Sequence, residues 1–312
     1  MYTDKKRKTR KLQELTMKDA FMFGAVLADT EICKDFLEMI LGISIDHIQI
    51  DTERTMIYNP EYRGVRLDVY VKDENNTVFN VEMQAQKEPQ IGRRSRYYQS
   101  QMDMVALESG HGYEEIPDSY VIFVCDYDPF GQKKYRYTFK NVCEEENSVQ
   151  LDDGRKTIIL STKGEDVENV PEEMVKFLKF ISSKLERCMD DFGDELIERL
   201  QNRMYNIKAS REMEGRYMRL ELLLHDERRR AREEGREEGR KEGRKEGHEE
   251  GRRETLENVV LDILNTKGIV SEQLKARILE ETDLELLKTW VRQAITVDSP
   301  ESFASIIQEG CK

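Results

Sequence analysis

Residues 62–84 read YRGVRLDVYVKDENNTVFNVEMQ, and this stretch is the most informative part of the sequence. Apolar and polar residues alternate on both sides of the polar segment 73–76, which is typical of a β-hairpin. Because successive side chains of a strand point to opposite faces, each strand has an apolar and a polar face. The expected faces are Leu67, Val69 and Val71 against Asp68 and Tyr70 in the first strand, and Val81 and Met83 against Glu82 and Gln84 in the second.

Two carboxylates, Asp68 and Glu82, meet if their strands pair in this way. Acidic oxygen donors on rigid strands, with the Gln84 amide beside them, suit a hard divalent cation such as Mg²⁺. The spacing also fits a plain alternative, in which both carboxylates lie on the solvated face of a hairpin and only repel each other. From the spacing alone, both interpretations stay open.

A wider pattern surrounds the two carboxylates. The pattern consists of Asp68, thirteen further residues and then Glu82-x-Gln84. It follows a predicted helix and precedes an Arg/Tyr-rich helix, and in this order it resembles the motif of the PD-(D/E)XK nuclease superfamily. More narrowly, it resembles the recombination-promoting nuclease or transposase-like branch, in which Gln replaces the usual Lys. Segments 16–23 (TMKDAFMF), 120–131 and 151–154 also resemble parts of this family, so the likeness covers most of the chain.

This resemblance implies a metal-dependent active site. Asp68 and Glu82 correspond to the ligands of one or two Mg²⁺ ions, for which Mn²⁺ is expected to substitute, and the Met83 carbonyl to a further ligand. Gln84 occupies the remaining catalytic position. Its amide can hydrogen-bond a water molecule but brings neither the positive charge nor the proton of a lysine.

Four residues outside the motif are candidates for a supporting role. Arg94 and Tyr98 are spaced i,i+4 on the predicted helix and are expected to contact phosphate or to orient Glu82, unless they are a solvated arginine and a half-buried aromatic. Arg93 lies next to Arg94 in a cluster of basic residues at 93–96. Asp19 either supplies an extra acidic group or forms a helix-capping pair with Thr16.

The order of predicted elements indicates an α/β fold. It corresponds to a restriction-endonuclease-like αβββαβ core with an α-helical C-terminal extension. The expected elements are a helical region 17–41 interrupted near 29–31, a strand 47–58, the hairpin, a helix 93–108, strands 119–125 and 135–142, and a helix 170–190 with Pro171 in its first turn.

The composition changes near Arg228. Glycine recurs at every fourth position from Gly235 to Gly251 in a Glu/Arg/Lys matrix. Five glycines oppose a helix by about 5 kcal/mol relative to alanine, whereas i,i+3 pairs such as Glu237–Arg240 support one. A spacer or a self-association segment is favoured over a dedicated binding surface, and a site where another backbone approaches closely is a further possibility. The predicted organisation is a nuclease-like domain (1–190), a helical connector (191–230), a helical or flexible spacer (231–254) and a small helical unit (255–312) with Trp290 in its core.

Charge and composition limit the function classes. The formal net charge of −13 argues against a general nucleic-acid coat protein. Cations nevertheless gather within residues 1–11 and at 93–96, and phosphate contacts depend on such local groups. No apolar run approaches the ~20 residues of a membrane span. The five scattered cysteines indicate reduced thiols in a cytoplasmic protein without a zinc site.

Two functions from different classes remain. The first is a cytoplasmic, Mg²⁺-dependent DNA endonuclease of low sequence specificity, acting in recombination, transposition or defence against foreign DNA. The second is a catalytically weak or silent nuclease-fold protein that binds or assembles. In both, the C-terminal region is a candidate for homo-oligomer formation, through a coiled coil or another weak contact.

Overall fold

The computed structural model describes residues 10–56, 65–107, 110, 112–146 and 148–309. The chain divides into two compact units, one up to Glu221 and one from Leu222 onward. Most of the basic cluster at 1–11, the end of the predicted strand 47–58, residue 108 of the predicted helix 93–108, and Cys311 lie outside the described residues. In the described part of the chain, no helix combines the length and apolar character needed to cross a membrane.

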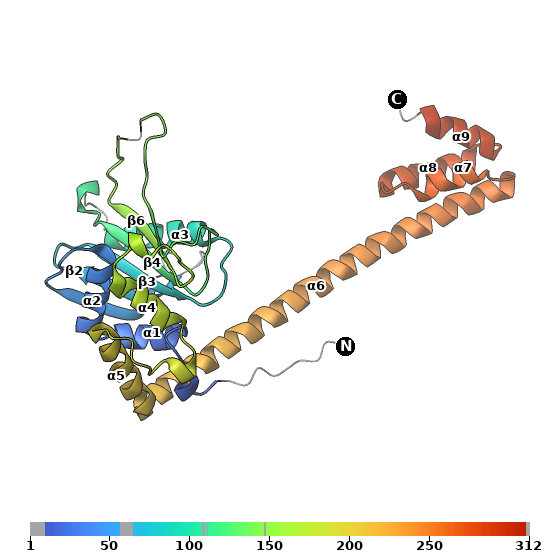
Figure 1. The fold of residues 1–312 in the computed structure, drawn as a ribbon. Coiled ribbons are helices and arrows are strands. Elements are labelled where there is room, and N and C mark those ends of the chain that lie inside the picture. Colours follow the sequence, from blue (N-terminus) through green and yellow to red (C-terminus); the bar gives the residue numbers. More distant parts are fainter. Residues whose placement is uncertain (1–9, 57–64, 108–109, 111, 147, 310–312) are drawn as a thin grey trace. The chain divides into compact units, whose positions relative to one another are not determined.

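The first unit is a mixed α/β structure (Figure 1). Its elements are α1 (Ala20–Leu27), α2 (Thr30–Leu41), β1 (Ile48–Met56), β2 (Val65–Asp73), β3 (Val78–Gln84), α3 (Ile91–Ala106), β4 (Ser119–Cys125), β5 (Arg136–Phe139), β6 (Arg155–Ser161), α4 (Glu172–Ser182), α5 (Glu195–Ala209) and the start of α6 (Arg211–Lys267). The strands form one sheet in the order β1-β2-β3-β4-β6-β5. The predicted αβββαβ order is confirmed.

The sheet combines two kinds of pairing. Strands β1, β2 and β3 are antiparallel neighbours, as the hairpin pattern predicts. Strand β4 pairs with β3 in parallel, β6 pairs with β4 in parallel, and β5 closes the edge in the antiparallel sense. Because β3, β4 and β6 run in the same direction, their carboxyl ends lie along one edge of the sheet.

Two apolar layers cover the sheet. On one face, helices α1, α2, α4 and α5 bury a large cluster around Phe23, Phe36 and Phe177. On the other face, α3 packs against a smaller cluster. Leu67 lies in the smaller cluster with Tyr70, so the prediction that it shares a face with Val69 and Val71 is wrong. Simple alternation therefore does not hold through Asp68.

Side-chain caps explain the helical break near residue 29. Asp29 precedes α2, and its Oδ1 accepts a hydrogen bond from the Ile32 N–H at 3.3 Å. Gly42 ends α2 with φ 69°, a backbone conformation that favours glycine. The predicted Thr16/Asp19 cap differs from the structure: Asp19 is itself the N-cap residue of α1, and its carboxylate accepts from the Thr16 N–H at 2.8 Å.

Two elements, β6 and α4, differ from the sequence prediction. Strand β6 was not predicted, although it lies between β4 and β5. Helix α4 ends at Ser182 rather than near residue 190, because Ser183 adopts an extended conformation and a short 3-10 turn follows. Pro171 is the N-cap residue of α4 rather than part of its first turn.

Helix α6 contains the glycine repeat and continues into the second unit. A Cβ atom placed on any of its glycines from 235 to 251 would meet nothing within 4 Å, so no other described part of this chain lies against them. A Lys241–Glu237 ion pair of 2.7 Å spans i,i+4, instead of the predicted Glu237–Arg240 pair.

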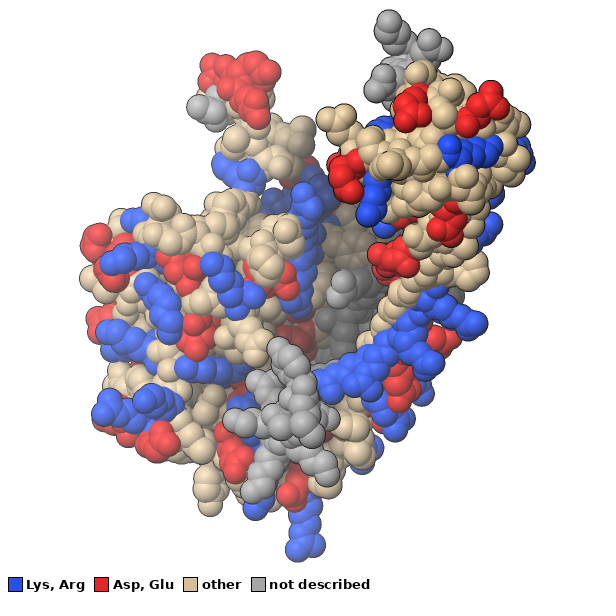
Figure 2. Space-filling view, turned by 90° about the vertical axis from the view of Figure 1, so that its right-hand side faces the viewer, with Lys and Arg blue, Asp and Glu red and all other residues tan. Residues whose placement is uncertain are grey.

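The second unit is a small helical bundle. It consists of the end of α6, α7 (Glu272–Leu279), α8 (Leu284–Thr296) and α9 (Pro300–Glu309). Trp290 is buried there with its ring 6.3 Å from that of Phe303, as expected of a core residue. On the first unit, acidic and basic side chains are interspersed over the visible face in Figure 2 rather than separated into two regions.

Candidate metal centre

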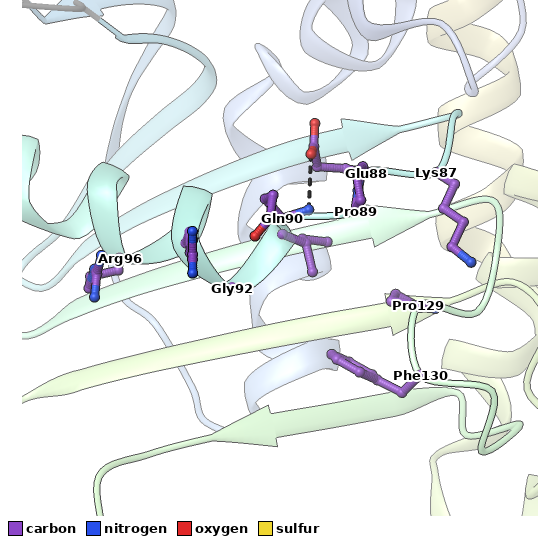
Figure 3. A pocket seen from close by; sticks show the side chains of 10 residues that line it. Lys87, Glu88, Pro89, Gln90, Gly92, Arg96, Pro129 and Phe130 are labelled. Carbon is purple, nitrogen blue, oxygen red and sulfur yellow. Dashed lines mark hydrogen bonds between the residues drawn. The ribbon is translucent and has the colours of Figure 1, made fainter. Parts of the chain in front are cut away.

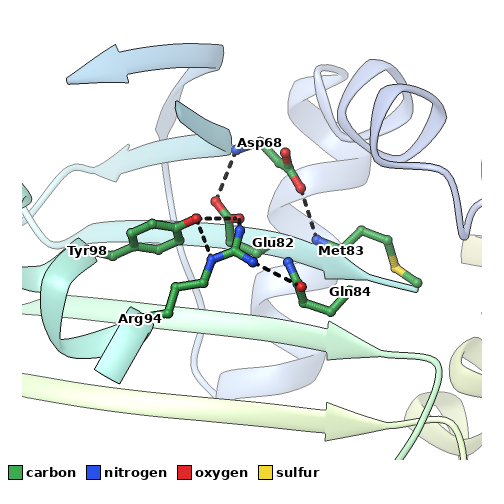
Figure 4. Close-up of polar contacts among 6 residues, drawn as sticks. All are labelled: Asp68, Glu82, Met83, Gln84, Arg94 and Tyr98. Carbon is green, nitrogen blue, oxygen red and sulfur yellow. Dashed lines mark hydrogen bonds and ion pairs between the residues drawn. The ribbon is translucent and has the colours of Figure 1, made fainter. Parts of the chain in front are cut away.

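Strands β2 and β3 separate where the two predicted carboxylates lie (Figure 4). Their ladder runs as far as the Val69–Val81 pair. Beyond it, the Asp68 N–H donates to Glu82 Oε1 at 3.2 Å, and the Met83 N–H donates to Asp68 Oδ2 at 3.1 Å. Each acidic side chain thus accepts from the backbone of the opposite strand. This reciprocal bonding fixes both carboxylates at the point of separation.

Glu82 is almost completely buried, with 1% of its surface exposed. Burial and the nearby Asp68 raise the pKa of Glu82, and Arg94 opposes that rise. Two carboxylates in a buried setting are unfavourable unless positive charge compensates them. The electrostatics of this point in the sheet therefore favour a bound cation.

Helix α3 supplies one positive charge to Glu82. Arg94 Nη2 lies 2.9 Å from Glu82 Oε2, and Arg94 Nη1 donates to Gln84 Oε1 at 3.0 Å. Arg94 Nε also donates to the Tyr98 hydroxyl at 2.7 Å, and that hydroxyl donates to Glu82 Oε2 at 3.3 Å. Burial raises the pKa of Tyr98, so its hydroxyl stays protonated and acts as a donor. The predicted helix pair does face the predicted carboxylates.

The donor set fits a hard divalent cation. Asp68, Glu82 and the Met83 main chain lie together at the strand separation and offer oxygen ligands only. No group of three or more His, Cys, Asp or Glu side chains suited to a metal occurs among the described residues. A site with two carboxylates resembles those of Mg²⁺, which commonly keeps several water ligands and uses one or two carboxylates. It does not resemble a zinc site.

A second charged cluster adjoins Gln84 and was not found from the sequence. The Asp126 N–H donates to the Gln84 main-chain oxygen at 3.0 Å. The Asp126 carboxylate pairs with Lys18 at 2.8 Å and with Lys163 at 3.0 Å. Partial burial would raise the pKa of Asp126, but the bonds from Lys18, Thr162 and Lys163 outweigh burial and lower it. Asp126 follows β4, and Thr162 and Lys163 follow the parallel strand β6, so recognition of β6 would have placed these three residues at this edge; Lys18 reaches it from the segment before α1.

A glycine in α1 supports the same region. A Cβ atom on Gly24 would lie 3.4 Å from the Asp68 main-chain oxygen, an ordinary van der Waals contact. Helix α1 therefore packs directly against the backbone at Asp68. The TMKDAFMF segment that carries the family resemblance leads directly into this glycine.

Two predicted supporting residues lie elsewhere. The Asp19 carboxylate forms an ion pair with Arg10 and accepts from Thr16, so it holds the segment before α1. Arg93 is exposed and lines a neighbouring pocket with Arg96, whereas Arg94 on the same helix reaches Glu82. A role of Asp19 or Arg93 in the reaction remains a prediction.

Comparison with known proteins gives one match. The family model described as "PD-(D/E)XK nuclease family transposase" matches residues 20–234, which include every element from α1 to α5. No curated protein and no solved structure matches the chain.

Proposed function

Because this chain belongs to the PD-(D/E)XK nuclease family transposases, we propose that it is a divalent-metal-dependent DNA endonuclease. It hydrolyses phosphodiester bonds with low sequence specificity, in recombination, transposition or defence against foreign DNA. The observation that carries the proposal is the Asp68–Glu82 pair, in which each carboxylate is fixed by a backbone N–H of the other strand.

Asp68, Glu82 and the Met83 carbonyl are the proposed metal ligands, with Mg²⁺ as the ion and Mn²⁺ as a substitute. A bound divalent ion acidifies a water molecule and stabilises negative charge on the scissile phosphate. The buried position of Glu82 supports this assignment, because a cation relieves the cost of two adjacent carboxylates.

The other site residues position groups rather than exchange protons. The Gln84 amide is held by Arg94 and is available to orient a water molecule. Arg94 and Tyr98 both contact Glu82 Oε2 and hold that carboxylate in one orientation. The Arg94 side chain is 31% exposed, and contact between its guanidinium and a phosphate of the substrate is part of the proposal.

One observation favours a second candidate, a silent nuclease-fold protein that binds or assembles. Arg94 already places a cation against Glu82 Oε2 and Gln84 Oε1, and Gln84 itself replaces the usual lysine. In this alternative the arginine takes the place of the metal and no cleavage takes place.

The deciding experiment is a supercoiled-plasmid nicking assay in Mg²⁺, Mn²⁺ and EDTA. Asp68→Asn and Glu82→Gln are the sharpest variants, because each keeps an oxygen that accepts the backbone N–H and removes the charge. We expect metal-dependent nicking by the parent and a loss of roughly 100-fold or more in each variant. Thermal unfolding by circular dichroism checks that both variants stay folded.

The same proteins separate the two candidates. Titration with Mn²⁺, followed by electron paramagnetic resonance, should show binding to the parent and weaker binding to both variants. Folded parent protein that binds no ion and nicks no plasmid in any metal would support the silent alternative. Equal nicking by parent and variants would show that the metal centre is assigned to the wrong residues.

A further inference from the structure

A pocket of about 650 Å³ lies where the loop after β3 enters α3 (Figure 3). One wall comprises residues 87–93 and Arg96, and the other is Pro129 with Phe130 from the loop between β4 and β5. The Glu88 N–H donates to the Tyr127 hydroxyl at 3.0 Å, which joins the two walls. The first residue that lines this pocket, Lys87, lies three residues after Gln84 in the sequence.

The pocket is positively charged. Lys87, Arg93 and Arg96 line it, and none of the three forms an ion pair with any described residue. Glu88 is the one acidic residue among those that line the pocket. Its Oε1 accepts a hydrogen bond from the N–H of Gln90, the N-cap residue of α3, at 3.1 Å, so one of its carboxylate oxygens is already bonded. In a chain with a net charge of −13, three cations around one hollow that pair with no acidic group in the described part of the chain indicate an anionic ligand.

An aromatic ring faces the same space. Phe130 is 40% exposed, although its ring packs against Tyr137 at 4.8 Å and Phe139 at 5.2 Å. Asp128 holds this loop by accepting from the Phe130 N–H at 3.0 Å, the Lys133 N–H at 2.7 Å and the Tyr137 hydroxyl at 2.9 Å. The ring is therefore held in place and still presents surface for a further stacking partner.

We propose that this pocket binds an unpaired nucleotide of the DNA substrate. Phe130 stacks on the base, and Lys87, Arg93 and Arg96 contact the flanking phosphates. An aromatic side chain can stack fully on a base only when that base has left the duplex, whereas cations alone would serve duplex and single strand equally. The chemistry thus favours single-stranded or flapped DNA over blunt duplex.

The proposal rests on the nuclease function and narrows its substrate class. Helix α3 carries both sets of contacts, because Arg94 reaches Glu82 while Arg93 and Arg96 line the pocket. A strand held by the pocket is therefore bound by the same helix that contacts the proposed metal ligand Glu82. Nothing in the pocket itself is required to bind the metal, so DNA binding and cleavage can be measured separately.

The test measures binding in EDTA, so that no cleavage takes place. Fluorescence anisotropy of labelled oligonucleotides compares a single strand, a blunt duplex and a duplex with a single-stranded overhang. We expect the full-length protein to bind the single strand and the overhang more tightly than the blunt duplex. Phe130→Ala should weaken single-strand binding by roughly 5- to 100-fold and leave the blunt duplex unaffected.

Matched variants separate stacking from packing. Phe130→Leu keeps an apolar side chain and should lose as much affinity as Phe130→Ala, whereas Phe130→Trp should retain it. Tyr113→Ala is the control, since Tyr113 is 85% exposed and does not line the pocket. Thermal unfolding of each variant checks that the loop substitutions leave the fold intact.

The phosphate contacts have their own readout. Arg96→Gln should reduce the salt dependence of single-strand binding by about 0.7 in the slope of log K against log salt, the value for one phosphate contact. Lys179→Gln removes an exposed cation from α4, on the other face of the sheet, and should leave the slope unchanged.

The outcomes are distinct from those of the nicking assay. Single-strand binding that is indifferent to Phe130 and Arg96, or no preference over blunt duplex, would overturn the pocket assignment even if the plasmid is nicked. Loss of nicking in Asp68→Asn with normal oligonucleotide binding would leave the assignment standing.

Discussion

Gln84 is the residue at which this site departs most from the wider nuclease pattern, and its contacts explain the amide. Gln84 Oε1 accepts from Arg94 Nη1, and the same guanidinium pairs with Glu82. An amide oxygen matches this donor, whereas a lysine ammonium would place a second cation against it. The Gln84 amide thus accepts a hydrogen bond from Arg94 without adding a second positive charge beside it.

This pairing predicts an unusual result at position 84. Gln84→Lys alone should lower metal-dependent nicking, by roughly tenfold or more, because the new ammonium repels Arg94 and disturbs Glu82. The double variant Gln84→Lys with Arg94→Gln should recover part of the loss, because the ammonium then replaces the guanidinium. The plasmid assay measures both.

Two results bear on the interpretation of Gln84. Arg94→Gln alone serves as the control, and it should be less active than the double variant. A gain of activity in Gln84→Lys alone would contradict the proposed pairing and would show that the site is a weakened lysine-type centre.

At the scale of the element, the five glycines of the α6 repeat, from 235 to 251, stand out because they weaken a helix and lie against no other described part of the chain. The glycines at 239 and 243 are exposed, and a Cβ at either would meet no described atom within 4 Å. Glycine costs a helix about 1 kcal/mol relative to alanine. The helix is held instead by packing at its two ends, where Tyr217 lies in the core of the first unit and Val260 in that of the second.

Alanine at these two positions should therefore stabilise α6. We expect Gly239→Ala and Gly243→Ala together to raise helicity and to add about 2 kcal/mol to the helix. Far-UV circular dichroism over a temperature ramp measures the effect. Gly154→Ala is a control with the opposite expected effect. It should lower the stability of the first unit, because Gly154 has φ 68° and a Cβ atom there would lie 2.3 Å from Asp118 Oδ1.

The glycine variants also test self-association. If a second copy of the chain packs against the repeat, alanine should weaken that contact and lower the oligomeric mass in light scattering. An unchanged mass with increased helicity would assign the repeat to a spacer.

At the scale of the whole molecule, the candidate chemistry and the glycine repeat belong to different units. The metal centre and the nucleotide pocket lie in the unit up to Glu221, whereas the repeat and the helical bundle lie from Leu222 onward. Each unit has its own apolar core. The first unit should therefore keep its fold without the second.

Deletion of residues 231–312 tests this division. The shortened protein should retain metal-dependent nicking and the thermal transition of the α/β unit, and should change its oligomeric mass in size-exclusion chromatography with light scattering. The full-length protein is the reference at equal concentration. A folded but inactive truncation would mean that the C-terminal region takes part in cleavage.

The sequence anticipated a large part of the sheet and the site, and β6 shows where it did not. The hairpin, the buried strand β4 and the helix break at Asp29 each have a local signal in periodicity or capping. Strand β6 begins with Arg155 and Lys156 before its apolar residues, so only its second half resembles a buried strand. Its position is set by parallel pairing with β4, which no local pattern encodes.

The placement of Asp68 and Glu82 on the two strands of a hairpin follows from the sequence, because apolar alternation and a polar turn are local properties. The burial of Glu82 and the convergence of Lys18 and Lys163 on Asp126 beside Gln84 come from the packing of the fold. The packing also selects between the two interpretations left open for Arg94 and Tyr98, because both contact Glu82. The contacts of Asp126 join elements that lie far apart along the chain. Packing of helices on both faces of the sheet brings them together, and that packing depends on the whole core rather than on any one segment.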